Sequence, residues 1–183
     1  MSEHPQRTPL TARAARIVVE ARGLLEEEGR DALTLRALAA RLGIRAPSLY
    51  KHIPDKAALE AALIEQGLAE MGEALHAALQ EPDPFGAVLR TYRAHALTTP
   101  NLYRLATTGP LPRERLAPGL EDWSGKPFFL LTGDPEQAQA LWAFAHGMVI
   151  LEIDGRFPAG SDLDRTWETG SAAFRGGGAG ADM

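Results

Sequence analysis

Polar side chains able to bind phosphate groups and base edges gather between residues 34 and 56. They bring hydroxyl, guanidinium, ammonium and imidazole groups, at Thr34, Arg36, Arg45, Ser48, Tyr50, Lys51, His52 and Lys56. Hydroxyl and ammonium groups suit phosphate oxygens, and the fork of an arginine matches the O6 and N7 acceptors of guanine. These residue types therefore indicate contact with double-stranded DNA. The plainer interpretation is a solvated helix face.

Two short helices joined by a tight turn would position these side chains. Thr34 suits the N-cap of the first helix, and Gly43 would stop it. Pro47 fits the first turn of the second, which carries residues 48–53 until Pro54 breaks it. So short a helix is marginal alone in water, but it makes sense if its outer face meets DNA. The pattern predicts a helix-turn-helix whose second helix enters the major groove.

Apolar residues at helical spacing predict the core beneath these two helices, at Leu35, Leu38, Leu42, Ile44, Leu49 and Ile53. Arg22, Arg30 and Arg41 are expected on the surface without facing DNA. The rest of the chain also has helical periodicity, which predicts an all-α fold with further helices over residues 11–28, 55–80, 85–97, 135–154 and 162–174. Residues 109–127 are rich in glycine and proline and predict short helical pieces and loops.

Composition limits the class of protein. The 183 residues include no cysteine, which excludes a disulfide framework, a thiolate zinc site and a cysteine nucleophile. No apolar run approaches membrane-spanning length, and the first ten residues do not resemble a secretion signal, so we expect a cytoplasmic protein. The net charge is −5, but residues 1–56 carry +3 and residues 57–183 carry −8. A basic amino-terminal third is typical of a chain that meets phosphates at one end.

Residues 33–56 resemble the DNA-binding domain of the TetR family of bacterial repressors. The similarity lies in Thr34, in Leu-Gly-Ile at 42–44, in Ser-Leu-Tyr-Lys-His at 48–52 and in Lys56. With the whole motif present, a solvated face is the weaker interpretation. The resemblance implies that base edges face Arg36, Ala46, Pro47, Ser48 and Lys51, and that phosphates contact Thr34, Tyr50, His52 and Lys56. Arg45 stands where many members have serine, which alters the helix cap, and it could contact either a base or a phosphate.

The family implies four regions: a flexible tail at 1–10, the helix-turn-helix at 11–56, an effector-binding and dimerisation domain at 57–175 and a disordered tail at 176–183. Its partners would be a double-stranded DNA operator, a second copy of the chain and a small apolar or aromatic effector, with no membrane and no cofactor. The candidate pocket residues are Tyr92, His95, Leu102, Tyr103, Trp123, Phe128, Phe129 and Phe144. The candidate dimer residues are Trp142, His146, Gly147, Met148, Leu151 and Phe174.

Two alternatives stay open. One is a DNA-binding regulator that is controlled by a protein partner or has no effector. The other is an enzyme that uses His146 with Glu152 or Asp154, but Glu152 lies six residues further on, on the far side of the helix. A lone histidine on an apolar helix is more often an interior or interface residue than a ligand. The sequence contains no metal-binding HExxH pair, nucleophile elbow or phosphate-binding glycine loop, so we predict neither a catalytic nor a metal site.

Overall fold

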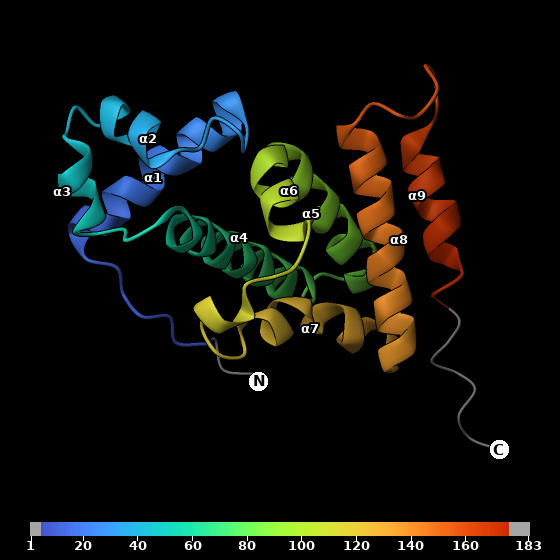
Figure 1. Ribbon diagram of the computed structural model, residues 1–183. Coiled ribbons are helices and arrows are strands. Elements are labelled where there is room, and N and C mark those ends of the chain that lie inside the picture. The colour runs from blue at the N-terminus through green and yellow to red at the C-terminus, as the bar shows by residue number, and fades with distance from the viewer. Residues whose placement is uncertain (1–4, 176–183) are drawn as a thin grey trace. The chain divides into compact units, whose positions relative to one another are not determined.

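The computed structural model describes residues 5–175, and all regular elements in that range are helices (Figure 1). They are α1 (Ala12–Glu28), α2 (Leu35–Arg41), α3 (Ala46–Tyr50), α4 (Lys56–Ala78), α5 (Pro84–Thr98), α6 (Pro100–Thr107), the 3-10 helix η1 (Arg113–Arg115), α7 (Leu120–Thr132), α8 (Pro135–Ile153) and α9 (Leu163–Ala172). The predicted all-α class is confirmed. The tail expected at 176–183 and the first four residues of the tail expected at 1–10 lie outside the described residues. No helix in the described range is both long and apolar enough to cross a membrane.

The described chain folds into two compact units. Unit 1 comprises residues 5–70 and 99–121, and unit 2 comprises residues 71–98 and 122–175. Each unit is therefore assembled from two separate stretches of chain, and α4 contributes residues to both. Segment 99–121 was expected in the effector region, but it folds with the helix-turn-helix residues. The functional boundary proposed after residue 56 remains a prediction.

One hydrophobic core holds unit 1 together. It includes residues of α1, α2, α3, α4 and α6, and its fully buried side chains include Ile17, Leu25, Leu33, Leu38, Leu49, Leu59, Leu63 and Leu102. Leu42 and Ile44, which were predicted in the core, are partly buried against it. Full burial of one leucine contributes about 1.5–3 kcal/mol. The shared core therefore stabilises short helices that would not form separately.

The ends of α2 and α3 follow from local sequence signals. The Thr34 hydroxyl accepts a hydrogen bond from the backbone N–H of Ala37 (3.1 Å), as predicted for an N-cap. α3 ends at Tyr50, earlier than the predicted 48–53. Pro54 disfavours a helical conformation at the residue before it, and the N–H groups of His52 and Ile53 both bond to the Leu49 carbonyl. A turn therefore replaces the last part of the expected helix.

The sequence analysis did not predict α6, which follows the expected helix over 85–97. Pro100 is the first residue of the helix, where proline loses no hydrogen bond. The carboxylate of Glu26, on α1, accepts hydrogen bonds from the backbone N–H groups of Asn101 (3.2 Å) and Leu102 (2.8 Å). A negative charge at a helix N-terminus is favourable. Glu26 therefore caps α6 and fastens it to α1 within unit 1.

Unit 2 packs α5 against α8 and α8 against α9. The Arg93 guanidinium on α5 binds Glu152 (Nε to Oε2, 2.9 Å) and Asp164 (Nη1 to Oδ1, 2.5 Å). Glu152 also accepts a hydrogen bond from the Trp167 indole N–H (2.5 Å), and only 6% of its side chain is exposed. Its two carboxylate oxygens are thus both bonded, so the buried charge is compensated. These contacts tie α5, α8 and α9 together.

Residues 120–132 form one helix, α7, which corrects the prediction of loops and short pieces over 109–127. Pro127 lies inside this helix and cannot donate a hydrogen bond to the Trp123 carbonyl four residues earlier. His76 Nε2, from α4, donates to that carbonyl instead (3.0 Å), and its ring stacks on the Trp123 ring at 4.8 Å. Gly72 makes room for this indole, since a Cβ there would come within 2.3 Å of it. The side chain of His76, which is distant in sequence, thereby replaces the hydrogen bond that Pro127 cannot donate.

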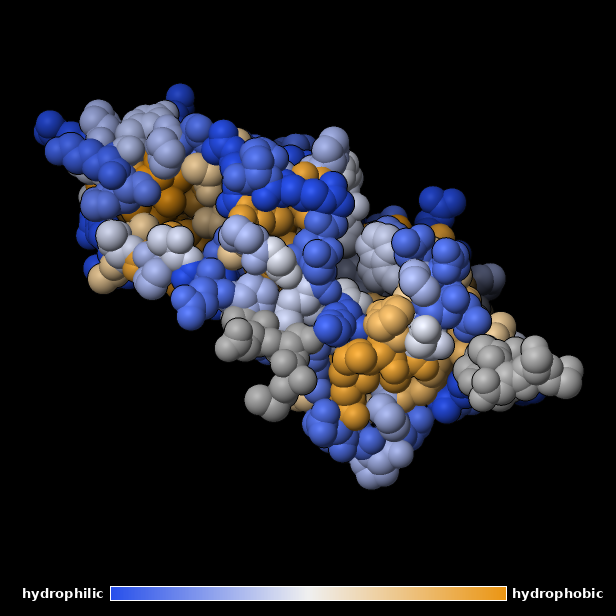
Figure 2. Space-filling model, turned by 90° about the horizontal axis from the view of Figure 1, so that it is seen from below, coloured by the Kyte–Doolittle hydropathy of each residue, from blue (hydrophilic) through white to orange (hydrophobic). Residues whose placement is uncertain are grey.

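Unit 2 also exposes large apolar side chains on its helices. Phe129 and Leu130 on α7, and Trp142 and Leu151 on α8, are each more than 40% exposed. An orange area at the lower right of Figure 2 shows apolar surface where Figure 1 has α7 and the first turns of α8. Exposed apolar patches of this kind are typical of surfaces that bind another protein or a ligand.

Replacing His76 by Phe should destabilise the protein by about 1–3 kcal/mol, because the ring can still stack on Trp123 but the carbonyl loses its donor. The loss should shrink in a Pro127→Ala background, where residue 127 regains an N–H for the same carbonyl. Urea unfolding of the four proteins in this double-mutant cycle measures the difference. An equal loss in both backgrounds would show that the carbonyl is not the reason for His76.

Candidate nucleic-acid interface

The turn between α2 and α3 runs from Leu42 to Arg45. Gly43 has a φ of 64°, which glycine adopts far more readily than other residues, and the Ile44 N–H donates to the Ala39 carbonyl (3.0 Å). Arg45 precedes α3 without a side-chain capping bond, as the arginine at this position predicts. Leu49 on α3 is fully buried. The turn and this anchor together fix α3 beside α2 and leave its other side facing solvent.

All ten predicted DNA contacts lie in unit 1, on or beside α2, α3 and the first residue of α4. Ala46 is half-buried, and the remaining nine are exposed: Thr34, Arg36, Arg45, Pro47, Ser48, Tyr50, Lys51, His52 and Lys56. Tyr50 is the one large aromatic residue among them, and half of it is exposed. The prediction that these residues contact DNA is compatible with this arrangement but is not tested by it.

The arginines predicted to lie on the surface without facing DNA each bind a carboxylate. The pairs are Arg22–Glu70 (2.6 Å), Arg30–Glu60 (3.0 Å), and Arg41 with Glu27 (2.5 Å) and Glu20 (3.3 Å). The hydrogen bonds that Arg41 donates, first to Glu27 and then to Glu20, raise the pKa of its guanidinium. These pairs brace α1 against α2 and α4 within unit 1. Their positive charges are therefore offset by neighbouring negative charges.

Arg36, Arg45 and Lys51 differ from that group. Within residues 5–175, no carboxylate lies within ion-pair distance of these three side chains, and all three are exposed. Among the described residues their donors have no hydrogen-bond partner in the protein, so they are available to a phosphate or a base edge. The helix-turn-helix therefore presents uncompensated positive charge on α2, the turn and the end of α3.

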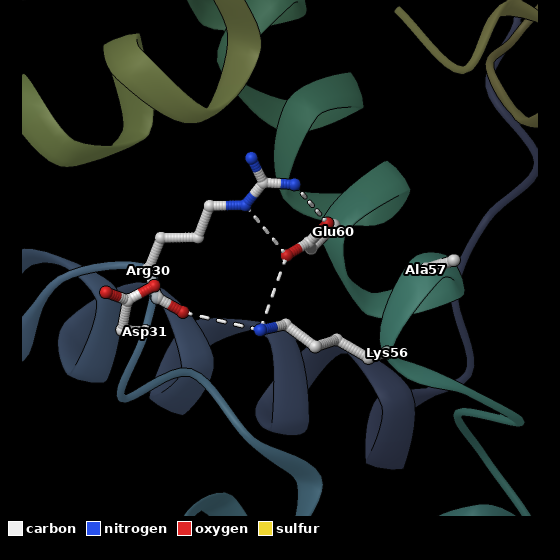
Figure 3. Close-up of a pocket in the computed structure, with 5 residues that line it drawn as sticks. All are labelled: Arg30, Asp31, Lys56, Ala57 and Glu60. Carbon is white, nitrogen blue, oxygen red and sulfur yellow. Dashed lines mark hydrogen bonds and ion pairs between the residues drawn. The ribbon is translucent and has the colours of Figure 1, made fainter. Parts of the chain in front are cut away.

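Lys56 occupies a polar hollow at the start of α4 that is open to solvent. Its Nζ lies 3.7 Å from Glu60 Oε1 and 3.4 Å from the Arg30 carbonyl oxygen. Arg30 binds both oxygens of the same carboxylate (3.1 and 3.0 Å), so the two cations flank Glu60 as Figure 3 shows. Asp31 and Ala57 complete the lining. Glu60 was missed by the sequence analysis, although its position four residues after Lys56 is a recognisable ion-pair spacing.

The predicted pocket residues are divided between the two units. Leu102 and Tyr103 are buried in unit 1, where Leu102 belongs to the core. Unit 2 contains the other six, which are Tyr92, His95, Trp123, Phe128, Phe129 and Phe144. Tyr92 and Phe128 are buried and meet edge to face at 5.5 Å, whereas Phe129 is exposed. The structure thus brings part of the set together in one unit and leaves two members in the other.

The predicted dimer residues lie on α8 and just after α9. Trp142 and Leu151 are exposed, Met148 is buried within unit 2, and a Cβ added at Gly147 would meet no atom within 4 Å. Phe174 is half-buried, 6.1 Å from the Phe144 ring. Trp142 and Gly147 lie on the same helix but five residues apart, so they do not share one helix face. An exposed aromatic side chain such as Trp142 is typical of a protein interface.

His146 stacks on Trp142, with ring centroids 5.8 Å apart, and burial lowers its pKa. Glu152, its suggested catalytic partner, is bonded to Arg93 and Trp167 instead. Among the described residues, no group of three or more histidine, aspartate or glutamate side chains could hold a metal ion. The observed contacts of His146 are those of a packed residue.

Comparison with known proteins identifies the family. Residues 17–63 match the family model "Bacterial regulatory proteins, tetR family". An uncharacterized HTH-type transcriptional regulator of Mycobacterium tuberculosis (strain ATCC 25618 / H37Rv), Rv0681, is 30% identical over 154 residues, which are 76% of this chain and 69% of that protein. The chain belongs to the TetR family. It is a DNA-binding transcriptional regulator.

Two further matches are a tetracycline repressor and a solved structure of a TetR variant. The tetracycline repressor protein class A from transposon 1721 of Escherichia coli is 50% identical over 54 residues, which are 30% of this chain and 25% of that protein. A solved structure of a TetR variant from Acinetobacter baumannii AYE, in complex with minocycline, has a TM-score of 0.62 and 24% identity; the match covers 91% of this chain and 95% of that one. The second match supports the TetR-family fold along most of the chain.

For this TetR-family regulator, Lys56→Gln should weaken binding to every duplex by the same factor, because a phosphate contact carries no sequence information. The slope of log affinity against log salt should fall by about 0.9. Fluorescence anisotropy with an operator and an unrelated duplex measures both quantities. Lys126→Gln, which removes one cation from unit 2, is the matched control and should leave the slope nearly unchanged.

Arg36→Ala should instead relax the base preference at one position of the operator. The loss of a bidentate contact to guanine reduces discrimination there by about 1–3 kcal/mol. Binding to a library of single-base operator variants measures this effect. If Arg36→Ala and Lys56→Gln changed affinity equally across the library, the division into base and phosphate contacts would be wrong.

Proposed function

We propose that this regulator is a homodimeric repressor that binds a near-palindromic operator through α3 and releases it when a small apolar or aromatic effector binds. The observation that carries the proposal is a set of exposed cations on the helix-turn-helix that have no ion-pair partner within residues 5–175, namely Arg36, Arg45 and Lys51. Each subunit would insert α3 into one major-groove half-site. Base contacts would come from Arg36, Ala46, Pro47, Ser48 and Lys51, and phosphate contacts from Thr34, Tyr50, His52 and Lys56.

Dimerisation would use α8 and α9. The exposed Trp142 and Leu151 supply apolar area, and Gly147 allows a close approach by a partner helix. The bonds of Arg93 to Glu152 and Asp164 support a rigid surface, because they fasten both helices to α5. A two-fold dimer repeats each contact, so its two α3 helices would match half-sites about 34–36 Å apart, or a multiple of that spacing.

The effector would bind in unit 2, whose aromatic side chains favour an apolar or aromatic molecule over a highly charged one. Tyr92 and Phe128 are the best-supported wall residues, since they are buried and in contact. The tetracycline repressor similarity and the minocycline complex of a related fold also favour a small aromatic effector. α4 contributes residues to both units and would carry the signal. A shift of the bound fraction from 99:1 to 1:99 requires about 5.5 kcal/mol of differential binding.

Trp142→Glu should separate the dimer, because a charge in a buried interface without a partner costs several kcal/mol. Light scattering should then report a single subunit, and operator affinity should fall at least about tenfold, since half of the contacts are lost. Leu97→Glu on α5, a comparably exposed apolar position, is the control and should remain dimeric. A Trp142→Glu protein that stayed dimeric would place the interface elsewhere.

Small apolar aromatic compounds should raise the melting temperature of the protein and release it from operator DNA in the same concentration range. Binding at 100 times Kd stabilises the folded state by about 2.7 kcal/mol. Tyr92→Ala should abolish the response to a compound while operator binding without the compound persists. Release only by a protein partner, with no stabilising compound, would instead favour a regulator controlled by a partner or lacking an effector.

A further inference from the structure

The segment between α6 and α7 returns to the start of α4 within unit 1. Leu111 and Leu116 pack against the unit 1 core. The Ala117 N–H donates to Glu65 Oε2 on α4 (2.9 Å). In Figure 1 this segment is the yellow stretch that follows α6. It is therefore fastened to α4 by both apolar and polar contacts, although some 50 residues separate the two in sequence.

Arg115 lies on this segment and reaches Asp55, the residue immediately before Lys56. Its Nη1 is 3.3 Å from Asp55 Oδ1, and the side chains of both residues are about half exposed. Asp55 also caps α4, since its Oδ1 accepts a hydrogen bond from the Ala58 N–H (2.6 Å). The carboxylate thus holds the guanidinium beside the amino-terminal end of α4, next to the lysine assigned to a phosphate.

We propose that Arg115 is a further contact to the DNA backbone, beside Lys56 and held in place by Asp55. The inference rests on the proposed phosphate contact of Lys56. A guanidinium has five N–H donors, and a single bond to Asp55 leaves the others for phosphate oxygens. Without Arg115, the Asp55 carboxylate would stand alone next to the phosphates and repel them.

Arg113, in the same short helix η1, is a suitable control for Arg115. Its Nε and Nη2 bind both oxygens of Glu121 at 2.6 Å, so its charge is offset by a two-point ion pair. The two arginines belong to one three-residue helix, and the loss of either removes one positive charge from the same segment. A general effect of net charge would therefore be equal for both, whereas a direct phosphate contact belongs to Arg115 alone.

The test compares Arg115→Gln with Arg113→Gln in the full-length protein, by anisotropy on operator and unrelated duplexes over a range of salt concentrations. Arg115→Gln should reduce the salt slope by about 0.9 and weaken both duplexes by about three- to tenfold at low salt. Arg113→Gln should leave the slope unchanged within error. Equal effects of the two variants, or an unchanged slope with a lowered melting temperature for Arg115→Gln, would overturn the proposal.

Asp55→Asn separates a phosphate contact from simple charge neutralisation, because asparagine keeps an Oδ1 that can accept from Ala58 and Arg115 but carries no charge. If Arg115 binds phosphate, Arg115→Gln should still lower the slope in the Asp55→Asn background. If that background abolished the effect, Arg115 would serve only to neutralise Asp55, and the contact would be disproved. Failure of the unaltered protein to bind any duplex would refute the proposed function itself, and this outcome is seen before a variant is made.

Discussion

α3 has only five residues, and a free helix of that length does not persist in water. Its conformation depends on the burial of Leu49, with Ile53 just beyond the helix, in the core of unit 1. Because successive side chains leave a helix at fixed angles, this anchor also determines that Ser48 and Tyr50 face outward. The orientation of the proposed DNA-binding residues on α3 thus depends on apolar side chains in the core.

The described arginines of unit 1 fall into two groups, those that are ion-paired and those that are not. Arginines that fasten helices to one another, such as Arg22 and Arg41, have carboxylate partners, and their charge is largely offset at short range. Arg36 and Arg45 have no such partner among the described residues, so their field extends into solvent. A protein with a net charge of −5 can therefore present a positive surface to a phosphate backbone, because screening confines each charge to about 10 Å.

The sequence predicted the parts of the fold that depend on neighbouring residues. Thr34 caps α2 and Gly43 ends it through bonds within four residues, and these signals are visible in the sequence. The missed elements depend on distant partners, since Glu26 caps α6 from some 75 residues away and His76 bonds α7 from 47 residues away. The basic residues of the interface were found by type and spacing, but their separation into paired and unpaired side chains required the three-dimensional contacts.

The contribution of α6 to the unit 1 core has a consequence for engineered regulators. Leu102 and Leu105 fill part of the hydrophobic centre beneath the helix-turn-helix, and Leu102 lies against Gly67 of α4. A chimera that joined the first 80 residues of this chain to a foreign sensor would leave that space empty. Exchange of sensing modules between such proteins must therefore transplant residues 99–121 together with the amino-terminal helices, since the two stretches form one folding unit.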